Sequence, residues 1–142
     1  MKQVEWTRDL SVGIELIDEQ HRMLIKCLND LKVALYHNEG TSKIGSTLDF
    51  LIEYTDFHFS AEQRHMAAQG YPELDAHKLK HAEFISTLNN IEQDFREDGA
   101  TPGLATAIDT LLVNWLLAHI RAVDTKFGAF LKDKGIVLAE EG

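Results

Sequence analysis

The chain has 142 residues, of which 44% are hydrophobic, enough for one domain with a substantial core and too few for two. Its 23 acidic residues outnumber its 14 basic ones, giving a net charge of −9, and lysine and arginine form no tight cluster of the kind that nucleic-acid binding requires. No uninterrupted apolar run is long enough to span a bilayer, and the first ten residues contain no signal-peptide segment, so we expect no membrane insertion and a cytoplasmic location.

The N-terminal residues show no sustained periodicity. We predict that residues 1–17 form an extended arm, in which Gly13 allows a turn. Asp18 is a plausible N-cap for a first helix, and leucines at helical spacing follow it until Asn38 and Gly40 end the helix.

Two further helices follow, each with an apolar stripe interrupted by polar residues. Thr41 or Ser42 could cap the second helix, which Gly70 ends, and Tyr71–Pro72 is expected to open the third, which Gly99 ends. The stripe of the second helix is Ile44, Leu48, Leu51, Thr55, His58, Glu62 and Met66. The stripe of the third is Leu74, His77, His81, Phe84, Leu88, Ile91 and Phe95.

A fourth helix is signalled by Thr101–Pro102, a cap followed by a proline in the first turn. Its inward stripe is Ala105, Ile108, Leu112, Trp115, Leu116 and His119. No strand-like alternation occurs, and short links between long amphipathic helices imply antiparallel neighbours. The fold class is therefore predicted to be all-α, an antiparallel up-down-up-down four-helix bundle. Residues 1–142 are expected to form a single domain with a short C-terminal tail at 135–142.

Seven polar side chains occupy positions where these patterns require core residues. Each buried polar group without a partner costs roughly 1–3 kcal/mol, so seven together would destabilise the fold unless a shared partner holds them. Metal ions are such a partner, and the set is large enough for two. The seven residues are His21, His58, Glu62, His77, His81, His119 and Asp124.

The spacing of these residues places them in pairs. His77 and His81 lie four residues apart on one helical face, as do His58 and Glu62. Asp124 follows His119 by five residues, which leaves it roughly 140° away on a regular helix. We therefore predict irregular backbone between Ile120 and Asp124, such as a π-bulge.

The ligand types narrow the choice of metal. A tetrahedral zinc needs only four ligands, whereas two six-coordinate ions that share bridging carboxylates would use all seven. Imidazole suits iron, zinc, copper and nickel, and carboxylates favour harder ions, so a nitrogen-rich di-iron centre is indicated, with manganese left open.

Three other residues of interest are expected to lie outside this site. Cys27 is the only cysteine, so it can form neither an intrachain disulfide nor a thiolate metal site, and we expect it to be buried. His65 completes a Glu-x-x-His motif with Glu62, but ferritin-like di-iron proteins need a second such motif, which this chain lacks. His37, near a helix end, is expected to be solvated.

The chain resembles the bacterial members of the hemerythrin family along nearly its whole length. The residues that carry the resemblance are Trp6, the stretch Gly13–His21, the stretch His58–Glu62, Tyr71–Pro72, the pair His77 and His81, the stretch Trp115–Ile120, and Asp124. Gln63 stands where the family often has a second glutamate. We expect this difference to leave the ligand set unchanged.

The resemblance implies a role for each residue. His77, His81 and His119 would saturate one iron ion, whereas His21 and His58 would leave the other with an open position. Glu62 and Asp124 would bridge the two iron ions together with an oxo or hydroxo group. Dioxygen would bind reversibly at the open iron. An apolar pocket would protect it from water, formed by Leu24, Phe59, Trp115, Leu116 and Ile120.

The expected function is thus reversible dioxygen binding, for storage, transport or delivery, and not enzymatic catalysis. One alternative is an oxygen- or redox-sensing module that acts through a protein partner not identified by the sequence. Another is a di-iron oxidase or peroxidase, against which stands the shortage of titratable groups near the open iron.

Overall fold

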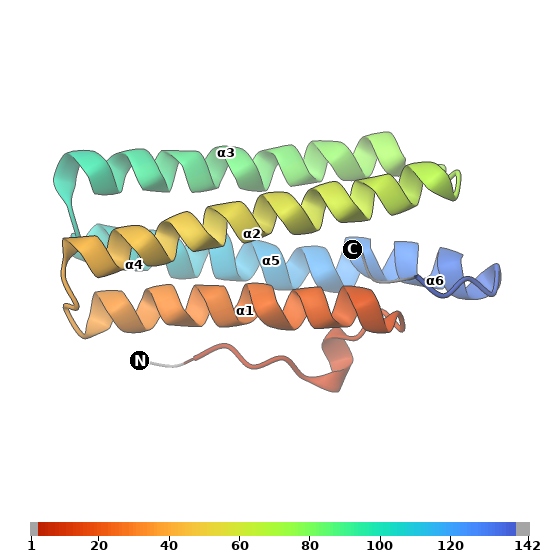
Figure 1. The fold of residues 1–142 in the computed structure, drawn as a ribbon, viewed down its shortest axis with the longest axis horizontal. Coiled ribbons are helices and arrows are strands. Elements are labelled where there is room, and N and C mark those ends of the chain that lie inside the picture. Colours follow the sequence, from red (N-terminus) through yellow and green to blue (C-terminus); the bar gives the residue numbers. More distant parts are fainter. Residues whose placement is uncertain (1–2, 139–142) are drawn as a thin grey trace.

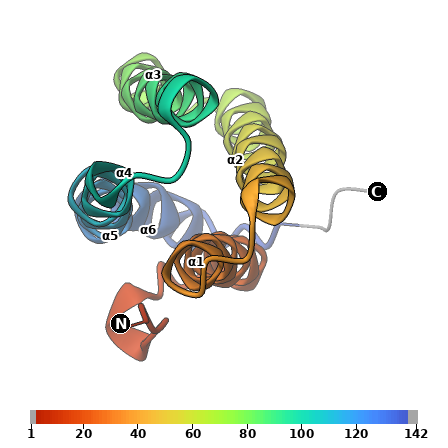
Figure 2. The same ribbon diagram turned by 90° about the vertical axis from the view of Figure 1, so that its left-hand side faces the viewer.

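The structure is a computed structural model, in which residues 3–138 are described. It is a four-helix bundle in which consecutive helices run antiparallel, as predicted (Figures 1 and 2). The first three helices are α1 (Glu15–Tyr36), α2 (Thr41–Ala68) and α3 (Leu74–Asp98). The fourth is one continuous rod made of α4 (Pro102–Ala107), η2 (Ile108–Val113), α5 (Asn114–His119), η3 (Ile120–Asp124) and α6 (Thr125–Asp133).

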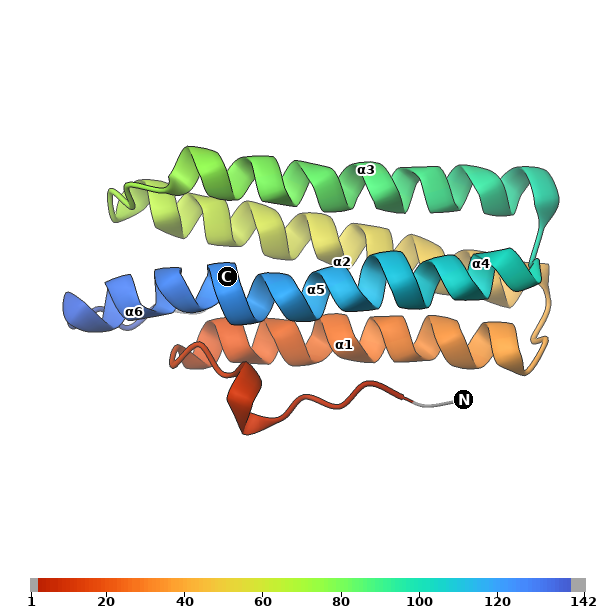
Figure 3. The same cartoon turned by 180° about the vertical axis from the view of Figure 1, so that it is seen from behind.

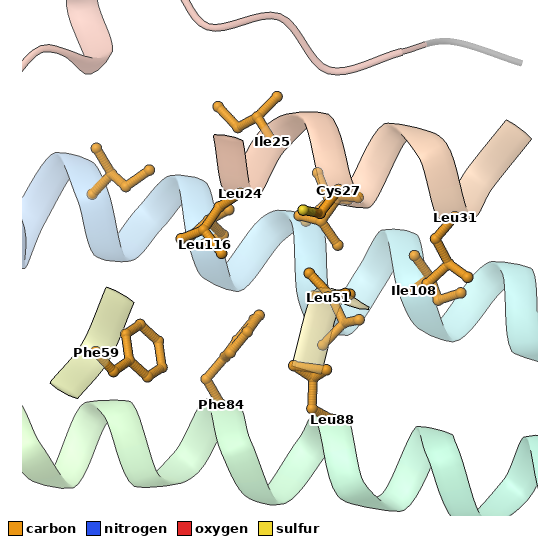
Figure 4. Close-up of a cluster of buried hydrophobic side chains, with 14 of the residues drawn as sticks. Leu24, Ile25, Cys27, Leu31, Leu51, Phe59, Phe84, Leu88, Ile108 and Leu116 are labelled. Carbon is orange, nitrogen blue, oxygen red and sulfur yellow. The ribbon is translucent and has the colours of Figure 1, made fainter. Parts of the chain in front are cut away.

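The core is formed by the inward stripes of all four helices. Figure 4 shows Leu24 of α1 and Leu116 of α5 facing Phe59 of α2 and Phe84 of α3, and all four side chains are buried. Cys27 also lies in this cluster with 2% of its surface exposed, which confirms that it is buried. Burial raises the pKa of the Cys27 thiol to about 11.

An N-terminal arm lies along the outside of α1 (Figure 3). Two hydrogen bonds hold its start, from Val4 N to Asn29 Oδ1 at 2.9 Å and from Asn29 Nδ2 to Val4 O at 2.7 Å. A short 3₁₀ turn, η1 (Arg8–Leu10), follows. The arm then passes over Gly128, where a Cβ atom would lie 2.1 Å from the Val12 carbonyl oxygen. Only glycine allows this close approach of arm and helix.

Several predicted boundaries were wrong by a few residues. The arm ends at Ile14 rather than residue 17, because α1 begins at Glu15. Asp18 is therefore not a cap but lies inside the helix, where its carboxylate accepts hydrogen bonds from Ser11 Oγ (2.5 Å) and Val12 N (2.9 Å). It connects the arm to the bundle instead of starting a helix.

The other three helices begin at or close to the predicted residues, but the predicted caps were not all correct. Gly40, at φ 97°, precedes α2, so Thr41 is its first residue and not its cap. Helix α3 begins at Leu74, two residues after Pro72. Thr101 caps the fourth helix as predicted, since its Oγ1 accepts a hydrogen bond from Leu104 N at 3.1 Å.

The fourth helix spans 32 residues, Pro102–Asp133, and by length and composition alone it could cross a membrane. The sequence analysis considered only uninterrupted apolar runs, so it did not identify this helix, in which polar residues interrupt the apolar ones. The apolar residues of this helix have another explanation in the bundle, where Leu112, Leu116 and Phe127 are almost fully buried. A core helix of a bundle passes the same test of composition.

Candidate metal centre

The seven polar residues singled out in the sequence meet at one level inside the bundle. His21 comes from α1, His58 and Glu62 from α2, and His77 and His81 from α3. The fourth helix contributes the last two. None of the seven exposes more than 4% of its surface. Their potential ligand atoms form two groups, each within 4.8 Å: Glu62, His77, His81, His119 and Asp124 in one, and His21, His58, Glu62 and Asp124 in the other.

Glu62 belongs to both groups because its two oxygens face different histidines. Oε1 lies 2.9 Å from His77 Nε2 and 3.2 Å from His81 Nε2. Oε2 faces the other way, 3.7 Å from His58 Nε2. The carboxylate thus stands between the three-histidine group and the two-histidine group.

Asp124 is divided in the same manner. Its Oδ1 lies 3.0 Å from the Nε2 atoms of both His77 and His119. Its Oδ2 lies 2.9 Å from His21 Nε2. Two carboxylates placed in this way could each bridge a pair of cations.

The inward-facing atoms have buried lone pairs that no hydrogen bond satisfies within residues 3–138. The atoms to which no hydrogen bond is assigned, and which contact only one another, include the Nε2 atoms of His21, His77, His81 and His119, both oxygens of Glu62, and Oδ1 of Asp124. Leaving so many polar atoms without hydrogen bonds in a core is costly, whereas cations would satisfy them all at once. The donor set, five imidazoles and two shared carboxylates, therefore fits two metal ions.

The fourth helix departs from regular α-helix between His119 and Asp124, where the five-residue spacing of these two ligands predicted a departure. Residues Ile120–Asp124 form a π-helical turn, η3, which confirms the irregular backbone predicted between Ile120 and Asp124. This turn brings Asp124 back to the face that carries His119. A second π-helical segment, η2, was not predicted; it lies at Ile108–Val113, away from the ligands.

Two glutamines orient histidines from behind, one in each group. His58 Nδ1–H donates to Gln20 Oε1 at 2.7 Å, and His81 Nδ1–H donates to Gln63 Oε1 at 2.8 Å. A histidine protonated at Nδ1 keeps its Nε2 lone pair free for a metal. Neither glutamine was predicted to have a role, although Gln20 stands next to the ligand His21 and Gln63 next to Glu62.

The electrostatics of the site favour charged carboxylates and a neutral His58. Burial and Asp124 both raise the pKa of Glu62, but His77 and His81 lower it more, to about 2. Burial also raises the pKa of Asp124, but three adjacent histidines hold it well below its ordinary range. Burial lowers the pKa of His58 to about 4, so its ring is neutral at pH 7.

The apolar residues expected to form a pocket surround the histidines unevenly. Phe59 stacks on His81 with ring centroids 3.7 Å apart, and Trp115 stacks on His119 at 4.4 Å, so both contact the three-histidine group. Trp115 is only partly buried. The remaining three, Leu24, Leu116 and Ile120, are buried in the core.

The two remaining histidines lie outside both groups. His37 is exposed just after the end of α1, as predicted. His65 is half-buried near the end of α2 and belongs to neither group of potential ligands.

The family model described as the hemerythrin HHE cation binding domain matches residues 12–131 of this chain. The chain belongs to the hemerythrin family. It is 35% identical over 127 residues to a bacteriohemerythrin of Stenotrophomonas maltophilia, an alignment that covers 89% of this chain and 80% of that protein. It is also 27% identical to a myohemerythrin of Theromyzon tessulatum, covering 87% of this chain and 89% of the relative.

Solved hemerythrin structures agree with the fold. A crystal structure of wild-type hemerythrin superposes with a TM-score of 0.80 at 27% sequence identity, covering 90% of this chain and 97% of that one. The hemerythrin resemblance found in the sequence is thus confirmed by both sequence and structure.

Proposed function

We propose that this protein binds dioxygen reversibly at two iron ions. The observation that carries the proposal is the pair of carboxylates, Glu62 and Asp124, each shared between a group of three histidines and a group of two. An unequal number of histidines supports one saturated ion and one ion with room for an exogenous ligand. Membership of the hemerythrin family supports iron as the metal.

The iron pair, when bound, would supply the electrons that hold dioxygen and recover them on its release. His77, His81 and His119 would hold one iron ion, and His21 and His58 the other. The protein's own residues fix these ligands: Gln20 and Gln63 set the orientation and tautomer of the rings behind them.

The surrounding residues favour binding over catalysis. Leu24, Leu116 and Ile120 bring no proton donor or acceptor into the bundle interior, and buried apolar side chains keep out the water that would favour side reactions. We also propose that arm and bundle act as one domain, since hydrogen bonds from Val4 and to Asp18 join them. A cytoplasmic location stays a prediction.

The test is to load the protein with ferrous iron without air, measure bound iron, and then admit and remove oxygen while recording visible spectra. We expect two iron equivalents per chain and a charge-transfer band that appears and disappears reversibly. Fewer than two equivalents would refute the two-metal site. Immediate irreversible oxidation would instead favour a sensor or an oxidase.

A further inference from the structure

One layer of side chains lies directly beside the histidines, one helical turn away from them. Helices α1 and α3 run in one direction, and α2 and the fourth helix in the other (Figure 1). Residues one turn after His21 and His81, and one turn before His58 and His119, therefore lie at the same end of the site. These residues are Leu24, Phe84, Thr55 and Leu116, all 1% exposed or less.

Thr55 is the only polar member of this layer. It lies on α2 between Leu51 and Phe59, and Figure 4 shows both of these side chains facing the same interior as Leu24 and Leu116. Its exposed fraction is 0%, and it is the one threonine that is buried among the residues described.

The hydroxyl of Thr55 has no hydrogen-bond partner within residues 3–138. Threonines inside helices ordinarily donate to the backbone carbonyl four residues earlier. Five helical threonines of this chain do so, at 2.7–3.3 Å: Thr47, Thr87, Thr106, Thr110 and Thr125. Thr55 makes no such bond to Leu51, although that carbonyl lies on its own helix.

An unpaired buried hydroxyl reduces the stability of a fold, and valine has nearly the same shape without this cost. The layer therefore carries a free hydrogen-bond donor beside the ligand histidines, at a place where an apolar residue would pack equally well. His58, the histidine nearest in sequence, belongs to the two-histidine group, which has the smaller number of ligands.

We propose that the Thr55 hydroxyl donates a hydrogen bond to the small exogenous ligand that enters this layer. The ligand class is a diatomic or triatomic molecule or anion with an acceptor atom at its free end. The inference rests on the proposed function, because the ligand would be held by an iron ion bound to the two-histidine group. Leu24, Phe84 and Leu116 exclude water, so within this layer Thr55 is the side chain that can form a hydrogen bond to the ligand and thereby orient it.

The experiment compares the iron-loaded wild-type chain with Thr55→Val and Thr55→Ser. Azide is the probe, and its dissociation constant is measured by optical titration of the oxidised protein. Thr55→Val should weaken azide binding about tenfold, the effect expected for losing one hydrogen bond to a charged ligand, whereas Thr55→Ser should stay within about twofold of wild type. Thr47→Val, the same change at a half-buried position two turns closer to the start of α2, is the control and should leave the dissociation constant unchanged.

A second measurement needs no metal. The melting temperature of metal-free Thr55→Val should rise by about 3–5 °C, because an unpaired buried hydroxyl is removed. A fall would show that the hydroxyl has a partner in the protein and would overturn the proposal. Equal azide affinity of the valine and serine variants would overturn it as well. Failure of the wild-type chain to take up two iron ions or to bind azide would instead refute the proposed function, so the two failures are distinguishable.

Discussion

Leu116→Ala tests whether the buried layer protects bound dioxygen. Leu116 lies one turn before His119 and exposes 1% of its surface, so the substitution creates a cavity inside the bundle rather than a surface notch. The cavity would open in the layer that contains the Thr55 hydroxyl, which could give an entering water molecule a polar partner. We therefore expect water to enter and the oxygenated protein to oxidise faster.

The expected change in the lifetime of the oxygenated form can be worked out from a single hydrogen bond. One hydrogen bond to Thr55 stabilises a water molecule by about 1 kcal/mol, which raises its occupancy about fivefold. If entry of water limits oxidation, the lifetime of the oxygenated form should fall by about the same factor. Removing a fully buried leucine also costs about 3 kcal/mol of unfolding free energy, or about 10 °C in melting temperature for a domain of this size.

Stopped-flow or conventional spectroscopy of the oxygenated protein in air measures this lifetime directly. Leu88→Ala is the matched control, since Leu88 is 0% exposed on α3 but lies one turn farther from the site than Phe84. It should destabilise the fold equally without changing the lifetime. An unchanged lifetime in Leu116→Ala, or equal acceleration in Leu88→Ala, would refute the protective role of the layer.

Two further substitutions test the shared carboxylate and the arm. Glu62→Gln should lower bound iron from two equivalents to one or fewer by elemental analysis, because one residue serves both groups, whereas Glu53→Gln on the exposed side of α2 should keep two. Gly128→Ala should lower the melting temperature by several degrees and speed proteolysis of the arm, because its Cβ would lie 2.1 Å from Val12 O. Gly45→Ala is the control: its Cβ would meet only an ordinary contact at 3.6 Å, so this change should be neutral or stabilising. Full iron loading in Glu62→Gln, or an unchanged melting temperature in Gly128→Ala, would contradict these assignments.

The sequence revealed the site because each ligand stands on an apolar stripe. His77 and His81 interrupt the steps of three and four that otherwise run through leucine and phenylalanine, so their burial could be predicted from the pattern alone. His58 and Glu62 do the same on α2. The structure places all of them within two groups of atoms.

Other features depend on contacts that no periodicity reports. Asp18 is a residue type that often caps helices, but its carboxylate accepts hydrogen bonds from the arm. Only the folded chain brings Ser11 and Val12 close to it. Gln20 lies next to a ligand and reaches a histidine on another helix, 38 residues away in sequence. The free hydroxyl of Thr55 depends on side-chain orientation, which residue type does not fix.

The π-helical turn η3 has a consequence for everything that follows it. On a regular helix, steps of about 100° per residue would place Asp124, Phe127 and Leu131 roughly 140°, 80° and 120° from His119. A π turn accommodates one extra residue, so the same three residues return to within about 40° of His119. All three are in fact buried. The turn therefore aligns a ligand and the core of α6 together.

Deleting one exposed residue from this turn should consequently be tolerated. Without Ala122, which is exposed, Asp124 would follow His119 by four residues, the spacing that joins His58 to Glu62, and the segment could become regular α-helix with the same face inward. We expect this deletion variant to fold and to bind two iron equivalents, measured by circular dichroism and elemental analysis. Deleting Glu53 from regular α2 should abolish metal binding, because it rotates the ligands beyond it by about 100° against the rest of the helix. Loss of iron in the Ala122 deletion would mean that the widened turn itself, and not the phase that it restores, holds Asp124 in place.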